Sequence, residues 1–176
     1  MTNSQDTLVL AETALGWAGA VLGPNGVRYA TLFHTTERAA RRELSLAGAC
    51  EQPDPRADDV ADRLRRYALG DGPVLDDYPV DVPAGTPLQR KVWAALRDVP
   101  YGETRSYGWL TKHVGEPSGA ARAVGAAVGA NPIPLWLPCH RVVASTGDLH
   151  GFGGGLAMKR RILEVEGALP KSLLPL

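Results

Sequence analysis

The chain has 176 residues, 44% of them hydrophobic and 22% charged, which allows one medium or two small globular domains and excludes extended disorder, collagen-like repeats and a coiled coil. Its formal net charge is zero, which taken alone argues against nucleic-acid binding. The charge is unevenly distributed, however. Residues 1–100 hold 11 basic and 14 acidic residues, a balance of −3, whereas residues 101–176 hold 8 and 5, a balance of +3.

Two cysteines, Cys50 and Cys139, are too few for a disulfide framework or a cysteine-rich zinc site, and this usage fits a reducing compartment. The first seven residues lack the basic region and the apolar stretch of a secretory signal. No apolar run approaches the roughly 18 residues that a membrane span needs. We therefore expect a cytoplasmic protein that does not bind membranes.

The first half of the chain predicts a small α/β domain over residues 1–80, with a linker to about residue 85. Short apolar runs, two of them separated by the turn residues 23–26, predict three strands. A helix capped by Thr35 or Thr36 should run to about Leu46, and a second helix should follow. The expected strands are 7–10, 16–22 and 27–33, the second helix is 58–69, and the extended linker begins near residue 75.

The second half, residues 86–176, predicts a mostly helical domain. Thr86 can cap a helix, Pro87 suits its first position, and Gln89 can close a capping box. Ser106 can cap the next helix, which a tight turn at 116–118 joins to a third. Such a pair is typical of a helix-turn-helix. Three prolines in 131–138 predict a stiff extended segment, and a last helix should span 156–166.

The third helix of this half is built almost entirely from small residues. Residues 119–130 contain six alanines, three glycines, two valines and Arg122, the one long side chain. One interpretation is a core helix that packs closely against its neighbours. The other is a smooth helix that enters a nucleic-acid groove with a single arginine as a wedge. Each interior glycine destabilises a helix by roughly 1 kcal/mol. This cost favours a functional explanation for the three glycines, such as close approach to nucleic acid.

A cysteine stands next to a histidine at positions 139 and 140. A thiolate is a strong nucleophile, and a nearby histidine base oriented by a carboxylate would raise the ionised fraction of the thiol. Neighbouring residues of an extended strand point to opposite faces, so contact between Cys139 and His140 would need a bend or a bridging water. The alternative is a buried structural cysteine beside a surface histidine. Glu166 lies at a helix C-terminus, where the helix dipole disfavours a carboxylate.

Together these segments resemble the O6-alkylguanine–DNA alkyltransferases, also called methylated-DNA–protein-cysteine methyltransferases. The resemblance covers residues 86–167 in order and spacing, and the N-terminal part agrees only in size and pattern. The matching segments are Thr86-Pro-Leu-Gln89, Pro100-Tyr-Gly-Glu103, Ser106-Tyr107, Ala121-Arg-Ala-Val-Gly125, Asn131-Pro132, Pro138-Cys-His-Arg-Val-Val143, Gly154-Gly-Leu-Ala-Met-Lys159 and Glu166-Gly167.

The resemblance implies a ribonuclease H-like α/β domain with a small antiparallel sheet, followed by a winged-helix-like domain with a helix-turn-helix. It also implies a DNA repair protein that binds the minor groove, flips an alkylated guanine out of the duplex and moves the alkyl group irreversibly to cysteine. The implied partner is double-stranded DNA that contains alkylated guanine, and the protein would bind it as a monomer. The resemblance leaves open whether binding is cooperative and whether O4-alkylthymine is also a substrate. No cofactor is implied.

The resemblance also assigns roles to residues. Cys139 would accept the alkyl group, His140 would be its base through a water, and Glu166 would orient His140. Tyr107 would contact DNA by crowding the target phosphate and would give a proton to the departing guanine. Asn131 would tie the helix-turn-helix to the active-site turn. Arg122 would fill the vacated stack. The other expected DNA contacts are Ser118, Ala121, Ala123 and Gly125, and the expected pocket residues are Pro134, Trp136, Val142, Phe152, Gly153 and Gly154.

The chain departs from the family pattern in three places. The turn before Ala121 is one residue longer than in many relatives, Phe152 replaces a frequent Tyr, and Gly153 stands where Ser can occur. Some relatives bind zinc in the N-terminal domain, but Cys50 and His34 alone predict no metal site here. The competing interpretations are a non-catalytic alkylated-DNA-binding protein, a cysteine hydrolase and a helix-turn-helix regulator, which would need several base-reading side chains.

Overall fold

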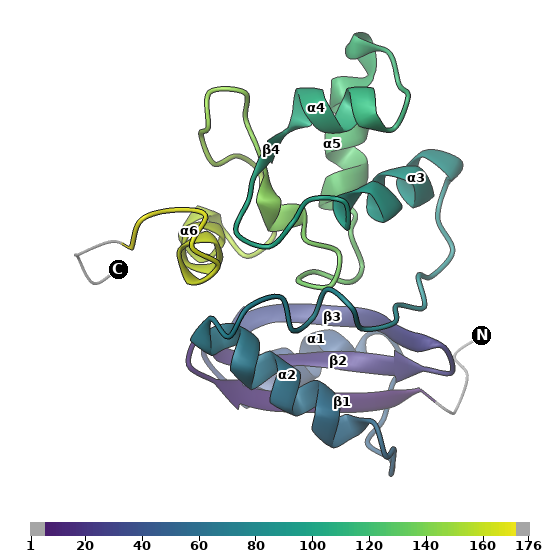
Figure 1. Ribbon diagram of the computed structural model, residues 1–176. Helices are drawn as coiled ribbons and strands as arrows, with labels where there is room; N and C mark the ends of the chain where they lie inside the picture. Colours follow the sequence, from purple (N-terminus) through teal and green to yellow (C-terminus); the bar gives the residue numbers. More distant parts are fainter. Residues whose placement is uncertain (1–5, 172–176) are drawn as a thin grey trace. The chain divides into compact units, whose positions relative to one another are not determined.

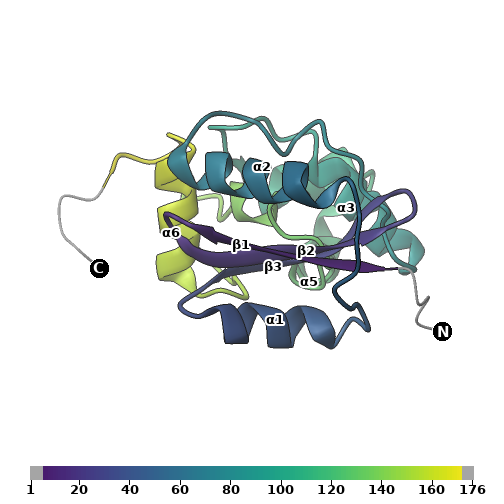
Figure 2. The same cartoon turned by 90° about the horizontal axis from the view of Figure 1, so that it is seen from below.

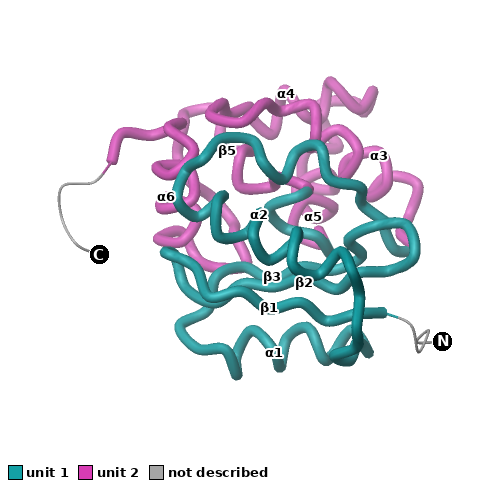
Figure 3. Tube along the Cα trace, turned by 60° about the horizontal axis from the view of Figure 1, so that its bottom comes forward, with its two compact units in different colours: residues 1–83, 132–136 teal, residues 84–131, 137–176 magenta. Residues whose placement is uncertain are grey.

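The computed structural model describes residues 6–171 (Figure 1). The chain divides into two compact units (Figure 3). The first unit runs to Pro83 and also includes Pro132–Trp136, and the second holds Ala84–Asn131 and the chain from Leu137 onward. The sequence-based boundaries placed residues 132–136 in the C-terminal domain, whereas their contacts group them with the first unit. One such contact is the hydrogen bond from the Ala30 amide to the Pro132 carbonyl, 3.1 Å.

A three-stranded antiparallel sheet forms the centre of the first unit. Its strands are β1 (Thr7–Thr13), β2 (Gly16–Gly23) and β3 (Gly26–His34), in the order β1-β2-β3. Short turns connect consecutive strands, and the register pairs Leu8 with Val21. The small antiparallel sheet expected from the sequence is therefore confirmed, and each strand is somewhat longer than expected.

Helices α1 (Glu37–Ser45) and α2 (Ala57–Leu69) cover opposite faces of this sheet (Figures 1 and 2). The Thr36 hydroxyl caps α1 by accepting the Ala39 amide proton, as the sequence predicted. Leu44 of α1 packs with Leu8 and Val21. A Cβ added to Gly19 would lie 2.8 Å from a Leu44 methyl group, so the glycine permits this close packing.

The second unit is mostly helical, and its helices begin where the sequence predicted. Thr86 and Gln89 form the expected capping box at the start of α3, and the Ser106 hydroxyl accepts the Trp109 amide proton at the start of α4. A short parallel pair joins β4 to β5. The elements are α3 (Pro87–Leu96), β4 (Arg105–Ser106), α4 (Tyr107–His113), the 3-10 turn η1 (Ser118–Ala120), α5 (Ala121–Gly129), the 3-10 turn η2 (Cys139–Arg141), β5 (Val142–Val143) and α6 (Leu156–Val165).

The segment before Cys139 differs from its expected extended form. Residues 134–136 form a turn, and Leu135 has a φ of 75°, an uncommon conformation for a leucine. The three prolines exclude a helix but allow this turn. Ile133, Leu135 and Trp136 are all buried, and the chain bends as these side chains leave water. None of the helices within residues 6–171 is long and apolar enough to cross a membrane.

Candidate functional site

Cys139 and His140 lie in the 3-10 turn η2, not in an extended strand as the sequence analysis assumed. Successive side chains of a 3-10 helix diverge by about 120°, compared with about 180° in a strand. The turn therefore supplies the bend that the Cys-His pair needed. Cys139 is 8% exposed and His140 and Arg141 are fully buried, so the thiol and the imidazole lie below the surface of the second unit.

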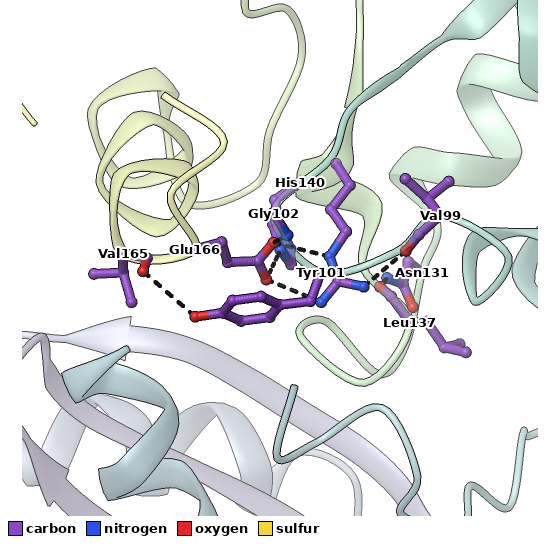
Figure 4. Close-up of polar contacts among 9 residues, drawn as sticks. Val99, Tyr101, Gly102, Asn131, Leu137, His140, Val165 and Glu166 are labelled. Atoms are coloured by element: carbon purple, nitrogen blue, oxygen red, sulfur yellow. Dashed lines mark hydrogen bonds and ion pairs between the residues drawn. The ribbon is translucent and has the colours of Figure 1, made fainter. Parts of the chain in front are cut away.

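His140 is held by Glu166, 26 residues further along the chain and directly after α6 (Figure 4). The His140 Nε2 atom lies 2.8 Å from Glu166 Oε1. A carboxylate accepts from Nε2–H, which places the ring proton on Nε2 and makes Nδ1 the basic nitrogen of the neutral ring. This is the His-Glu pair that the resemblance implied, and it is a geometry suited to a general base.

The same carboxylate also binds Arg141, a contact that the sequence analysis did not include. Arg141 Nε donates to Glu166 Oε2 at 2.9 Å and Nη2 donates to Oε1 at 3.0 Å. The remaining Nη1 donates to the Val99 carbonyl at 2.8 Å. The Tyr101 ring lies 5.6 Å from the guanidinium carbon. Glu166, the Val99 carbonyl and the Tyr101 ring therefore hold the Arg141 guanidinium in place. Its two hydrogen bonds in turn fix the plane of the Glu166 carboxylate.

Gly102 completes the surroundings of Glu166. Its amide donates to Glu166 Oε2 at 3.4 Å, and its φ of 77° lies in the left-handed region that favours glycine. A Cβ at this position would lie 3.0 Å from the Glu166 carbonyl. The Pro100-Tyr-Gly segment thus ends α3 in a loop that both bends sharply and supplies a donor to the site.

Electrostatics keep Glu166 ionised and His140 neutral. Burial alone would raise the pKa of Glu166, but the charge and hydrogen bonds of His140 and Arg141 outweigh it and hold this pKa at about 2. Burial lowers the pKa of His140, and the charges of Arg141 and Lys159 lower it further against the opposing pull of Glu166. The resting site therefore contains a carboxylate and an uncharged imidazole.

The Cys139 thiol is held in a balance of opposing effects. Burial raises its pKa, while a hydrogen bond from Asn131, the positive charge of Lys159 and the backbone amides of Cys139 and His140 lower it. Asn131 also donates from Nδ2 to the Leu137 carbonyl at 2.7 Å, just before the turn. Asn131 thus connects the end of α5 to the active-site turn, as expected. The thiol stays protonated at rest, and its surroundings favour the thiolate once a base is available.

Lys159 is a second site residue to which the sequence analysis assigned no role. Its side chain is fully buried, and Nζ donates to the Val142 carbonyl at 2.6 Å and the His150 carbonyl at 3.1 Å. The ammonium also lies 5.9 Å from the centre of the Phe152 ring. Lys159 shares a face of α6 with the buried Ile162 and Leu163, three and four residues later.

Tyr107, the first residue of α4, is partly buried. Burial raises the pKa of its phenol, and the neighbouring charge of Cys139 raises it further. The phenol is therefore a neutral donor at physiological pH and acts within electrostatic range of the thiol. These properties suit a group that gives up a proton only when a strong base forms beside it.

Helix α5 has a buried side and an exposed side made of small residues. Val124, Ala127 and Val128 are buried, and Trp93 of α3 donates from its indole nitrogen to the Ala127 carbonyl at 2.9 Å. Among the described residues, and apart from the backbone of α5 itself and the adjoining residues, no heavy atom lies within 4 Å of a Cβ placed on Gly125 or Gly129. Internal packing therefore does not require these glycines, which removes the close-packing explanation for them.

Most of the expected DNA contacts lie on this exposed side or just before it. The exposed ones are Ser118, Ala121, Arg122 and Ala123, and Gly125 is partly exposed. Of the expected pocket residues, Val142 is buried and Phe152 partly buried, while Gly153 and Gly154 are exposed. Pro134 and Trp136 lie in the segment that groups with the first unit. Within residues 6–171, no three His, Cys, Asp or Glu side chains are placed to hold a metal ion.

Comparison with known proteins agrees with these features. The model of the family described as "6-O-methylguanine DNA methyltransferase, DNA binding domain" matches residues 87–168. A methylated-DNA–protein-cysteine methyltransferase of Mycobacterium tuberculosis is 48% identical over 116 residues, which make up 65% of this chain and 68% of that protein.

Two solved structures extend the similarity to nearly the whole chain. The M. tuberculosis protein OGT, solved in complex with DNA, is 36% identical with a TM-score of 0.72, over 92% of this chain and 93% of that one. The O6-methylguanine-DNA methyltransferase of the archaeon Pyrococcus kodakaraensis is 26% identical with a TM-score of 0.70, over 92% and 99%. The chain therefore belongs to the family of methylated-DNA–protein-cysteine methyltransferases.

Proposed function

We propose that this protein repairs DNA by moving an alkyl group from O6 of guanine to Cys139, once per molecule. The observation that carries this proposal is the buried thiol next to a histidine that Glu166 and Arg141 hold in place. Family membership supports the reaction class. A thioether product has no easy route back to a thiol, so the protein is consumed in the reaction.

Each residue has one task in the proposed reaction. His140 takes the thiol proton of Cys139, directly or through a water, and its imidazolium is stabilised by Glu166. The sulfur attacks the alkyl carbon, so that a C–S bond forms and the C–O6 bond breaks. The electron pair of the broken bond moves onto the guanine, which leaves as an anion. Tyr107 gives its phenol proton to that anion and regains a proton from water.

Recognition would rely on shape more than on base-reading side chains. A helix that exposes alanines and glycines can approach a minor groove closely, and Arg122 can replace a base that leaves the stack. The O6 atom lies inside the duplex, so the guanine must be flipped out to reach a buried thiol. In this proposal the second unit is the winged-helix-like DNA-binding domain, and the first is the ribonuclease H-like domain.

The proposed partner is double-stranded DNA containing an alkylated guanine, bound by a monomer. A nucleophile that must remain a reduced thiol fits a reducing compartment, and we place the protein in the cytoplasm on that ground. No cofactor takes part, because a protein thiol, a base and a proton donor account for every bond made and broken.

Intact-mass analysis after mixing with an O6-methylguanine duplex tests the proposal. The expected product is the protein plus one methyl group, located on Cys139 by peptide mapping, with one equivalent of guanine restored per protein. The Cys50→Ser variant is the matched control and should react as fully as the parent. An adduct on Cys50, repeated turnover, or no adduct in the folded protein would each contradict the proposal.

A further inference from the structure

Arg141 occupies an unusual place in the site. It is fully buried, and its two contacts with Glu166 occupy both carboxylate oxygens, one of which also receives His140. The Val99 carbonyl holds the third guanidinium nitrogen, so the arginine cannot swing away without breaking a buried hydrogen bond.

The net charge of the buried site explains what Arg141 does for Glu166 and His140. With Arg141 present, the buried group formed by Arg141, Glu166 and neutral His140 has no net charge. Without Arg141, no positive charge would contact the carboxylate, and a buried negative charge draws a proton onto the neighbouring His140. His140 would then already be protonated and could not accept the proton of the Cys139 thiol.

We propose that Arg141 is a positioning residue for alkyl transfer: it cancels the charge of Glu166 while fixing its plane, so that His140 rests as a neutral, correctly oriented base. This inference rests on the roles proposed above for Cys139 and His140. Burial lowers the pKa of His140, which agrees with a neutral resting ring. The charged groups that act on His140 are Glu166 directly after α6, Arg141 in η2 and Lys159 in α6. The charge of Cys139 acts on Tyr107 at the start of α4.

A purely structural role for Arg141 makes a different prediction. If the arginine only stabilised the fold, its replacement would slow transfer by the same factor at every pH. If it sets the charge of His140, its replacement moves the acid limb of the pH–rate profile, the pH range in which activity is lost as His140 becomes protonated. The position of that limb therefore separates the two roles.

The experiment measures the single-turnover rate of methyl transfer between pH 5 and 9. In Arg141→Met, we expect the acid limb to rise by about one pH unit or more, because Glu166 then raises the pKa of His140 without the opposing charge of Arg141. Arg141→Lys keeps the charge, so its limb should stay near that of the parent although the rate falls. Arg160→Met, which removes the exposed arginine of the Arg160–Glu164 pair on α6, outside the proposed site, is the matched control and should change neither.

Two further measurements test the inference even if the Arg141→Met variant does not fold. The double variant Arg141→Met with Glu166→Gln leaves no uncompensated buried charge, and its limb should lie no higher than that of the parent. In the unmodified protein, nitrogen NMR of the His140 ring should show a neutral ring at pH 7 with its proton on Nε2. A charged ring at pH 7, an unmoved limb in folded Arg141→Met, or a raised limb in the double variant would each overturn the inference. A parent protein that transfers no methyl group would instead refute the proposed function.

Discussion

The surroundings of Cys139 and the exposed side of α5 belong to the same unit and are built on opposite principles. Around the thiol, large polar side chains are buried and held by hydrogen bonds: His140, Arg141, Lys159 and Glu166 are at most 5% exposed. On α5, nearly all residues are alanine, glycine or valine, and the one long side chain, Arg122, is exposed.

This difference separates chemistry from recognition. The reaction needs charges held in fixed places away from water, where electrostatic interactions are strong. Recognition of a duplex by shape needs a surface that imposes few side chains of its own and can come close to the sugar-phosphate backbone. Substitutions should therefore affect either bond formation or DNA engagement, and seldom both. The following predictions test that separation.

The largest effect is expected from Cys139→Ser. A serine hydroxyl keeps the size of the side chain but has no accessible anionic form near neutral pH, so no alkyl group should be transferred. Affinity for an O6-methylguanine duplex, measured by fluorescence anisotropy, should stay within about twofold of the parent, well under 1 kcal/mol. A large loss of affinity would show that the thiol region and the DNA surface are coupled.

Glu166 should make the fold sensitive to acid. Its pKa of about 2, against an ordinary 4.5, gives a contribution to the free energy of unfolding of about 3 kcal/mol that is complete above pH 4.5 and is lost as the pH falls towards 2. Glu166→Gln should lack this dependence in urea titrations at stepped pH. The lowered pKa of His140 causes a separate loss beginning below pH 6.5, and this loss should be larger in Glu166→Gln, because Glu166 raises the pKa of His140. Equal acid dependence in the two proteins between pH 4.5 and 2 would contradict the assignment.

Arg122→Ala should separate the two regions most directly. Its loss removes the group proposed to fill the vacated stack, and unstacking energies of a few kcal/mol correspond to a rate about 10- to 100-fold lower on duplex DNA. Reaction with the free base O6-benzylguanine should be nearly unchanged, because no stack has to be opened. Equal losses on both substrates, measured as second-order rate constants, would eliminate the proposed role.

The smallest effect is expected from Gly125→Ala. This substitution should increase the stability of the fold and decrease the affinity for duplex DNA. Open space surrounds the position, so the added methyl group should raise the free energy of unfolding by about 0.5–1 kcal/mol through helix propensity. If α5 approaches DNA closely there, duplex affinity should fall. A variant with greater stability and unchanged affinity would place the DNA contact elsewhere on the helix.

Local signals in the sequence predicted much of this fold. Caps at Thr36, Thr86 and Ser106 set the starts of three helices because each side-chain oxygen satisfies an amide of its own first turn. Such interactions are complete within four residues. The strands followed in the same way from apolar runs and the turns between them.

The parts that were wrong or absent depend on contacts across long stretches of chain. Arg141 and Lys159 belong to residue types that are rarely buried, and their partners are the distant Glu166 and backbone carbonyls, which no local pattern announces. The turn around Leu135 arises from burial that outweighs an unfavourable φ. The 3-10 turn at Cys139 was missed in the same way, because the sequence analysis treated the Cys-His pair as part of an extended strand.

The hydrogen bond from Trp93 to the Ala127 carbonyl also gives the protein a built-in optical probe. The indole lies behind the very helix proposed to enter the groove, on its buried side, where solvent and DNA bases do not reach it directly. Any displacement of α5 would alter this bond and with it the emission of Trp93. Replacing the other three tryptophans with phenylalanine would therefore allow the approach of the helix to DNA to be followed in real time by stopped-flow fluorescence.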